Sequence, residues 1–463
     1  MAFIMDKYDD GYRLTHELKH DFNKRAIAIA IPVIIQNLIS IGLGMVDTIM
    51  IGKLGEEQLA GVGAGNQVLW LFWGFIFGYY SGANAHSSQY YGAGDIHKVR
   101  QVMGLDVLVG IICGVVVCIL SLFFSPYTTL LFSRDPVVVG YGVQYVRIVC
   151  FANFISFISY AITYNCRVVS RLKAVTIINM LALSFNMLAN YTLIFGKFGF
   201  PRLEVQGAAI ATVVARIIEL AAVIIYLVVS KDHPLRCNIK ELFSFHKDLA
   251  IAVTKTALPV VGGEVLLSGI ASLVFAIYGL LGTAALAVVQ VAEVVANMTQ
   301  VTFFGLGNAC AVLIGQALGQ FDEKRAFEYG RISIKIALIL CVFSAALILI
   351  LIKPMAVIYG FAEETTSLLI KTMIAWSIVT FPQMMAYTIV CGILRAGGDT
   401  MFCFKMDILC NVFIQIPLAL LAVVVFHAPL YIAVLFVNVS VCVKVVFTLS
   451  RTYSRRWINT YNV

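Results

Sequence analysis

One carboxylate interrupts an uncharged stretch near the start of the chain. Between residues 26 and 51 the only charged side chain is Asp47, in the segment MVDTIMIGKLG. A charge at the centre of a bilayer costs about 2.5–3.5 kcal/mol on insertion scales, so such a residue usually faces an interior cavity, where it can bind a cation or a proton. Gln36, Asn37 and Ser40 precede it and indicate a wetted helix face. Alternatively, Asp47 lies one turn from the end of its segment and simply reaches the outer interface.

The composition places Asp47 in a membrane protein. Of the 463 residues, 60% are hydrophobic and 13% are charged, whereas soluble proteins carry about 25% charged residues. Runs of about 20 apolar residues, enough to cross the hydrocarbon core, centre near residues 38, 70, 113, 150, 184, 218, 266, 298, 340, 380, 414 and 440. The prediction is an all-α polytopic membrane protein with twelve transmembrane helices in two six-helix lobes.

The basic residues predict the orientation. If the N-terminus is inside, 22 of the 33 Lys and Arg lie in cytoplasmic segments and five on the opposite side, as the positive-inside rule requires. We therefore expect a multi-pass protein of the plasma (inner) membrane with both termini cytoplasmic, and no nucleic-acid partner. The expected parts are a cytoplasmic segment 1–25, a lobe 26–229, a cytoplasmic linker 230–249, a second lobe 250–452 and a cytoplasmic tail 453–463.

The two halves of the sequence form an internal repeat. A single constant shift of the sequence against itself aligns IPVIIQN at 31 with LPVVGGE at 258, and QYYGAGDIHK at 89 with QALGQFDEKR at 316. Six spans are an even number, so both copies have the same orientation, which predicts a parallel repeat with a cleft between the lobes. Secondary transporters have this architecture, with ligand sites near the repeat interface.

Three motifs carry a family resemblance. The segments PVIIQNLISIGLGMVDTIMIGKLGEEQLAGVG, LIFGKFGFPRLEVQGAAIATVVAR and GILRAGGDT resemble those of the MATE (multidrug and toxic compound extrusion) transporters, in the same order and across the whole chain. The resemblance implies export of small organic compounds, often amphipathic cations, in exchange for Na⁺ or H⁺ by alternating access. It implies no cofactor beyond the coupling ion, and we expect a monomer.

The resemblance also implies a cation site in the N-terminal lobe. The matching aspartate in the family binds the coupling cation, and its partners correspond here to Asn186, Asn190 and Thr212. Asn186 and Asn190 are four residues apart and so share one helical face. Carboxylate, amide and hydroxyl oxygens suit Na⁺, which Asp47, Asn186 and Asn190 would hold, but the aspartate could instead take a proton. The two amides could also merely bridge helices.

The C-terminal lobe departs from part of the family. Some members have a glutamate and an aspartate in a second cation site, but here the tenth span has no acid and Met384 stands where the aspartate is expected. Glu264 corresponds in the repeat to Asn37, and Glu293 corresponds to Asn66. Either acid could line the cleft, carry protons or be neutralised by a nearby Lys or Arg.

The remaining candidates concern packing and the substrate. Arg216 and Glu219 are three residues apart and should pair locally. Asp407 is expected at an interface or in an ion pair, with a proton relay as the alternative. Aromatic faces attract organic cations and methionine adapts to varied shapes, although both more often serve packing. The candidates for the substrate cleft are Gln36, Asn37, Asn66, Glu264, Glu293, Gln383, Met384 and Tyr387.

Two rival functions predict other features. A flippase for a lipid-linked precursor would need a cationic cleft to hold phosphates, whereas this chain offers Asp47, Glu264 and Glu293. An intramembrane enzyme would need a nucleophile–base or metal set, but all seven His lie in the tail or in connections. The Gly-rich stretches GVGAG and RAGGD lack the Lys-Ser/Thr ending of a phosphate loop, so we expect no ATP hydrolysis and no enzyme.

Overall fold

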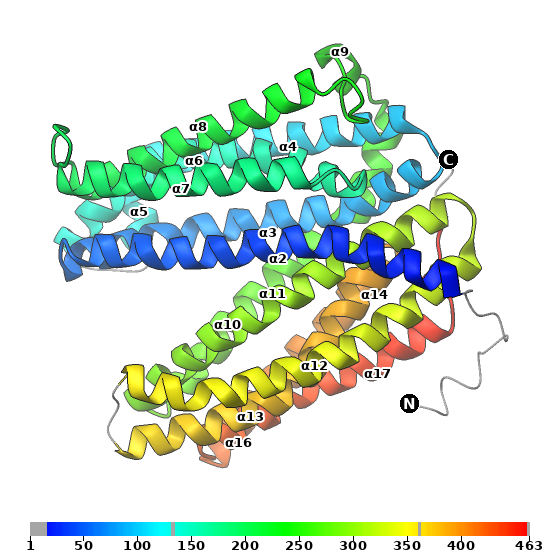
Figure 1. Ribbon diagram of the computed structural model, residues 1–463. Helices are drawn as coiled ribbons and strands as arrows, with labels where there is room; N and C mark the ends of the chain where they lie inside the picture. Colours follow the sequence, from blue (N-terminus) through cyan, green and yellow to red (C-terminus); the bar gives the residue numbers. More distant parts are fainter. Residues whose placement is uncertain (1–15, 131–134, 360–362, 461–463) are drawn as a thin grey trace. The chain divides into compact units, whose positions relative to one another are not determined.

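The computed structural model describes residues 16–130, 135–359 and 363–460. Residues 1–15 of the predicted cytoplasmic N-terminal segment and 461–463 of the predicted tail lie outside this range. Figure 1 shows helices joined by short connections, and the described residues contain no strand. Twelve helical stretches among them are long and apolar enough to cross a membrane. The predicted all-α, twelve-span fold is confirmed, because each span contains one of the predicted centres.

The first six spans begin and end where charged or turn-forming residues interrupt the apolar runs. Asp95 and Asp135 cap two of these helices, since their carboxylates accept the backbone N–H of Lys98 and Val137, a usual N-cap arrangement. The helices are α2 (His16–Gly52), α3 (Glu56–Gly92), α4 (Ile96–Phe123), α5 (Ser125–Leu130), α6 (Pro136–Val168), α7 (Lys173–Phe195), α8 (Glu204–Val229) and the short α9 (Ile239–Leu242).

The second six spans include three π-helical segments. Two of the spans are composite, because α-helix and π-helix alternate along residues 363–394 and 400–425. The elements are α10 (Lys247–Gly279), α11 (Thr283–Gly319), α12 (Glu323–Tyr359), α13 (Glu363–Tyr387), η1 (Thr388–Leu394), α14 (Thr400–Asp407), η2 (Ile408–Gln415), α15 (Ile416–Leu420), η3 (Leu421–Val425), α16 (Leu430–Val437) and α17 (Val439–Tyr453).

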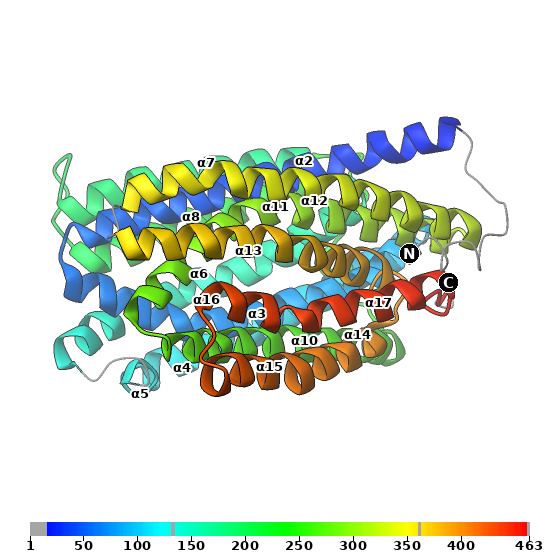
Figure 2. The ribbon, with the colours of Figure 1, turned by 90° about the horizontal axis from the view of Figure 1, so that it is seen from below.

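The chain divides into two compact units. The N-terminal unit comprises Ile35–Ser87 and Asp95–Thr254, and the C-terminal unit comprises Met1–Ile34, Ser88–Gly94 and Lys255–Val463. Helices α2 and α3 therefore contribute residues to both. Within the N-terminal unit α6 packs against α4 and α8, and α7 packs against α8 (Figure 2). Within the C-terminal unit α12 packs against α11 and α13.

Two glycines, at equivalent positions of the two repeats, allow a close helix contact inside the C-terminal unit. A Cβ added to Gly92, at the end of α3, would lie 2.0 Å from the backbone oxygen of Gln316 on α11. A Cβ added to Gly319 would lie 1.9 Å from the backbone oxygen of Gln89. Gly92 of the first repeat thus contacts Gln316 of the second, and Gly319 of the second contacts Gln89 of the first. Only glycine permits so close an approach of the two helices.

Replacing Gly92 by Ala is expected to destabilise the fold, because the added methyl group meets backbone rather than a flexible side chain. Overpacking of this kind costs about 1–3 kcal/mol, and the thermal unfolding midpoint of the purified protein would report it. Gly269→Ala on α10 is the control, since a Cβ there meets nothing within 4 Å. An unchanged midpoint for Gly92→Ala would contradict the close contact.

Candidate functional site

The N-terminal unit brings Asp47 and Asn190 into contact. Asp47 lies partly buried on α2, and its Oδ1 accepts a hydrogen bond of 2.7 Å from the Asn190 amide on α7. Asn190 is 1% exposed, and its amide oxygen is buried without a hydrogen-bond partner. The contact therefore places a carboxylate beside an amide oxygen that is free to accept a further group.

The other two residues of the predicted cation site form a second pair. The Asn186 amide donates to the Thr212 hydroxyl on α8 at 3.4 Å, and that hydroxyl donates to the Ala208 carbonyl at 2.9 Å. Asn186 lies one turn before Asn190 on the same helix. The structure thus places the four predicted residues on α2, α7 and α8 as two hydrogen-bonded pairs.

Asp47 has no ion-pair partner among the residues that the structure describes. Arg216 on α8 lies close enough to interact with it electrostatically, but the Arg216 guanidinium donates to Glu219 Oε2 at 2.5 Å. The predicted local pair is therefore confirmed. Glu219 also accepts hydrogen bonds from Ser159 and Asn179 at 3.2 and 2.7 Å. Glu219 thus pairs with the Arg216 guanidinium, and the Asp47 carboxylate remains able to bind a different cation.

Three predicted cleft residues also belong to the N-terminal unit. Gln36 on α2 has a buried side-chain oxygen without a hydrogen-bond partner, and its neighbour Asn37 is half-buried. Asn66 on α3 lies within hydrogen-bonding reach of the Tyr145 hydroxyl, which in turn interacts electrostatically with Asp47. Asn66 and Tyr145 thus lie on the side of Asp47, whereas Gln36 and Asn37 lie about three turns before it on α2.

In the C-terminal unit Glu264 is neutralised by a neighbour. Arg395, which is 3% exposed, donates to Glu264 Oε1 at 2.9 Å. On the same unit Asp407 forms an ion pair with Lys444 of α17, and a Cβ on Gly263 would lie 3.0 Å from Asp407 Oδ2. Of the alternatives for Glu264, the structure therefore shows the ion pair, and the expected pairing of Asp407 is confirmed.

The other C-terminal candidates have different surroundings. Glu293 is exposed on α11, and the Gln383 amide donates to Asn438 at 2.8 Å. Met384 is buried in a hydrophobic cluster, and the Tyr387 ring meets Phe304 edge to face at 5.0 Å. Glu293 thus keeps an open carboxylate, whereas Met384 occupies a packing position.

One further buried carboxylate of the N-terminal unit was not singled out from the sequence. Asp106 on α4 is 2% exposed, and its Oδ2 accepts from the Asn165 amide at 2.8 Å. The Asn165 oxygen accepts from Ser87 at 3.1 Å, whereas Asp106 Oδ1 is buried without a partner. The signal was available, because Asp106 is the only acid between Gln101 and Ser133, the criterion that drew attention to Asp47.

The fold places the protein in the class of multi-pass helical membrane proteins built from a repeated six-span unit. The chain belongs to the MatE family, whose model matches residues 32–192 and again residues 259–421. The two matches begin at Pro32 and Pro259, which the repeat alignment also pairs, and this confirms the internal repeat. The protein is therefore a membrane transporter of that family.

Relatives of known name agree with this assignment. The probable multidrug resistance protein YoeA of Bacillus subtilis is 24% identical over 396 residues, 84% of each chain. A probable multidrug resistance protein NorM of Agrobacterium fabrum is 25% identical, covering 69% of this chain and 68% of its own. A solved multidrug resistance MATE family transporter of the MOP superfamily, 18% identical, has a TM-score of 0.85 and covers 96% of this chain and 100% of its own.

Proposed function

We propose that this transporter is an antiporter that exports amphipathic organic cations in exchange for Na⁺ or H⁺ by alternating access. Membership of the MatE family and the multidrug resistance names of its relatives support this proposal. The distribution of Lys and Arg supports a plasma-membrane location with both termini cytoplasmic. Inward movement of the coupling cation down its gradient would then drive export.

The observation that carries the proposal is the contact between Asp47 and Asn190. One carboxylate neutralises one monovalent cation. The carboxylate and the unpartnered Asn190 oxygen are hard oxygen ligands of the kind that Na⁺ prefers. Asn186 lies one turn away on α7 and donates to Thr212 of α8. A proton on Asp47 would satisfy the same charge balance. We therefore assign the coupling cation to this site.

Binding of the cation would change the contact between α2 and α7. Asp47 accepts the Asn190 N–H, and a Na⁺ ion held by both side chains would require the Asn190 oxygen to turn toward the carboxylate. A ligand shifts a conformational equilibrium only when it binds the two states differently. A turn of this amide on cation binding would therefore change the contact between α2 and α7 and so bias alternating access.

For binding of the exported compound, Glu293 of the C-terminal unit is a better candidate than Glu264. Glu293 is exposed, whereas Glu264 is paired with Arg395, so the former can attract an organic cation without breaking an ion pair. We propose no contact for Met384, which packs in the hydrophobic cluster.

The experiment is efflux of a fluorescent organic cation from liposomes that contain the purified protein. A Na⁺ gradient and a pH gradient are imposed separately, each at zero membrane potential. The proposal predicts efflux with one gradient and none when it is collapsed by the matching ionophore. Equal efflux with and without any gradient would contradict ion coupling, and no efflux with either would contradict the substrate class.

A further inference from the structure

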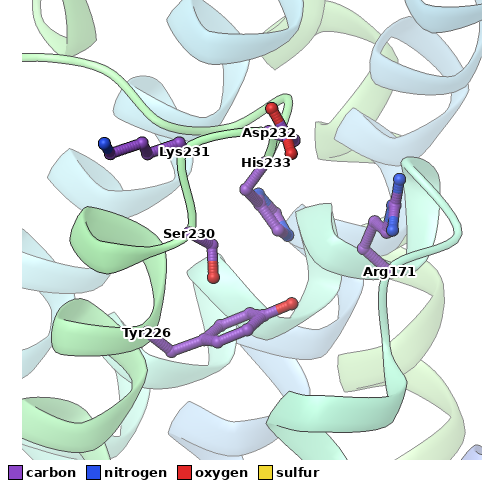
Figure 3. Close-up of a pocket in the computed structure, with 6 residues that line it drawn as sticks. All are labelled: Arg171, Tyr226, Ser230, Lys231, Asp232 and His233. Atoms are coloured by element: carbon purple, nitrogen blue, oxygen red, sulfur yellow. The ribbon is translucent and has the colours of Figure 1, made fainter.

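A pocket of about 290 Å³ lies in the N-terminal unit, outside the Asp47 site. Its size is close to the lower end of small-molecule sites, roughly 300 Å³. Three chain segments form it: the turn between α6 and α7, the last turn of α8 and the connection that follows α8 (Figure 3). The lining residues are Arg171, Tyr226, Ser230, Lys231, Asp232 and His233.

His233 packs edge to face against Tyr226 at 5.5 Å and has a buried ring N–H without a hydrogen-bond partner. The residue is 5% exposed, its Nδ1 accepts the backbone N–H of Leu235 at 3.2 Å, and its Nε2 is buried without a hydrogen bond. Burial and the positive charge of Arg171 lower the pKa of His233 to about 4, so the ring is neutral at pH 7. Because Nδ1 accepts a hydrogen bond, the ring proton lies on Nε2. A buried donor of this kind calls for an acceptor.

The charges of the lining residues favour an anion of single charge. Two cations, Arg171 and Lys231, and one carboxylate, Asp232, leave a net charge of one positive, since His233 is neutral. Within the described part of the chain none of these three charged side chains forms an ion pair. In Figure 3 Arg171, the His233 ring and the Tyr226 hydroxyl face a common space, whereas Lys231 extends away from it.

Apolar side chains adjoin this polar pocket. The final two turns of α8 expose two of them on the side next to Tyr226, and the helix is a spanning segment. Such a surface suits acyl chains, whereas a soluble anion would gain nothing from it. These side chains are Ile225 and Val229, which lie one turn apart and are 61 and 70% exposed.

We propose that this pocket binds the phosphate diester of a membrane phospholipid. The phosphate oxygens accept hydrogen bonds from the Arg171 guanidinium, the His233 Nε2–H and the Tyr226 hydroxyl, and Ser230 supplies a further hydroxyl. The acyl chains lie along α8. A phosphate diester carries one negative charge and so balances the lining charge, and Asp232 disfavours anions of higher charge. This site is separate from the cation site and does not depend on the proposed transport activity.

The test is binding of phosphatidylglycerol to the full-length protein in uncharged detergent, followed by native mass spectrometry. The wild type is expected to hold one lipid, and Arg171→Ala to weaken binding about 10-fold or more, the usual scale for a hydrogen bond to a charged group. Arg236→Ala removes the same charge from the connection that follows α8, outside the pocket, and it should change binding by less than about twofold.

Further variants separate the pocket from general surface charge. His233→Gln keeps an N–H donor and should bind the lipid more tightly than His233→Phe. If His233→Phe does not fold, Tyr226→Phe replaces it, since that variant removes only a hydroxyl and should also weaken binding. Equal losses for Arg171→Ala and Arg236→Ala would overturn the proposal. Inorganic phosphate or glycerol 3-phosphate, tested separately, should bind far more weakly than the lipid. Equal affinity for either one would assign the pocket to a soluble anion instead.

Discussion

Replacing Asp47 by Asn is expected to abolish gradient-driven efflux while the protein still folds. The amide keeps the size of the side chain but removes the only formal negative charge assigned to the coupling cation. Substituting even the supporting partners of an ion ligand lowers affinity about 10–100-fold, so loss of the charged ligand should lower cation affinity by at least about 100-fold. The rate of efflux from liposomes under the effective gradient would report this loss.

The matched control is Asp21→Asn. Asp21 is an acid on the same helix, and its carboxylate lies in a long contact of 3.9 Å with Arg25 rather than in the proposed site. We expect near-normal efflux from this variant. The thermal unfolding midpoints of both variants should lie near that of the wild type. Efflux by Asp47→Asn at the rate of the control would refute the central role of Asp47.

Replacing Lys444 by Met is expected to destabilise the C-terminal unit by about 3–5 kcal/mol, the range for breaking a buried ion pair on one side. Lys444 is 9% exposed and its partner Asp407 is 1% exposed. Removing the ammonium therefore leaves a buried carboxylate without its cation. The free energy of unfolding in mixed micelles, measured by denaturant titration, checks this value.

A double variant distinguishes charge from packing in this experiment. Asp407→Leu combined with Lys444→Met replaces the pair by apolar groups, which is often neutral for a buried ion pair, so most of the lost stability should return. Lys335→Met on α12 removes an exposed Lys and should change the unfolding free energy by less than about 1 kcal/mol. A double variant as unstable as Lys444→Met alone would contradict the ion-pair explanation.

The fold could be predicted because its signals are local or periodic. The length of each apolar run determines a span, and one constant shift of the sequence against itself reveals the repeat. The same holds for Arg216 and Glu219, which are three residues apart on one helix. Contacts of this kind follow from helical spacing alone.

The partners of the buried polar groups could not be predicted in the same way. Asp407 meets Lys444 across 37 residues, and Asp106 meets Asn165 across 59, and no spacing rule connects such positions. The contact of Asp47 with Asn190 spans 143 residues and was expected only from the family resemblance. Helix packing determines which of these residues contact each other, so the pairs can be identified only from the structure.

The most direct test of the central claim is the stoichiometry of cation binding to the purified protein. Radioactive Na⁺ binding and the release or uptake of protons would be measured for the wild type and Asp47→Asn. The account predicts one monovalent cation, Na⁺ or H⁺, bound per chain by the wild type and lost in the variant. Cation binding that persists unchanged in Asp47→Asn would contradict the assignment of the coupling site to Asp47.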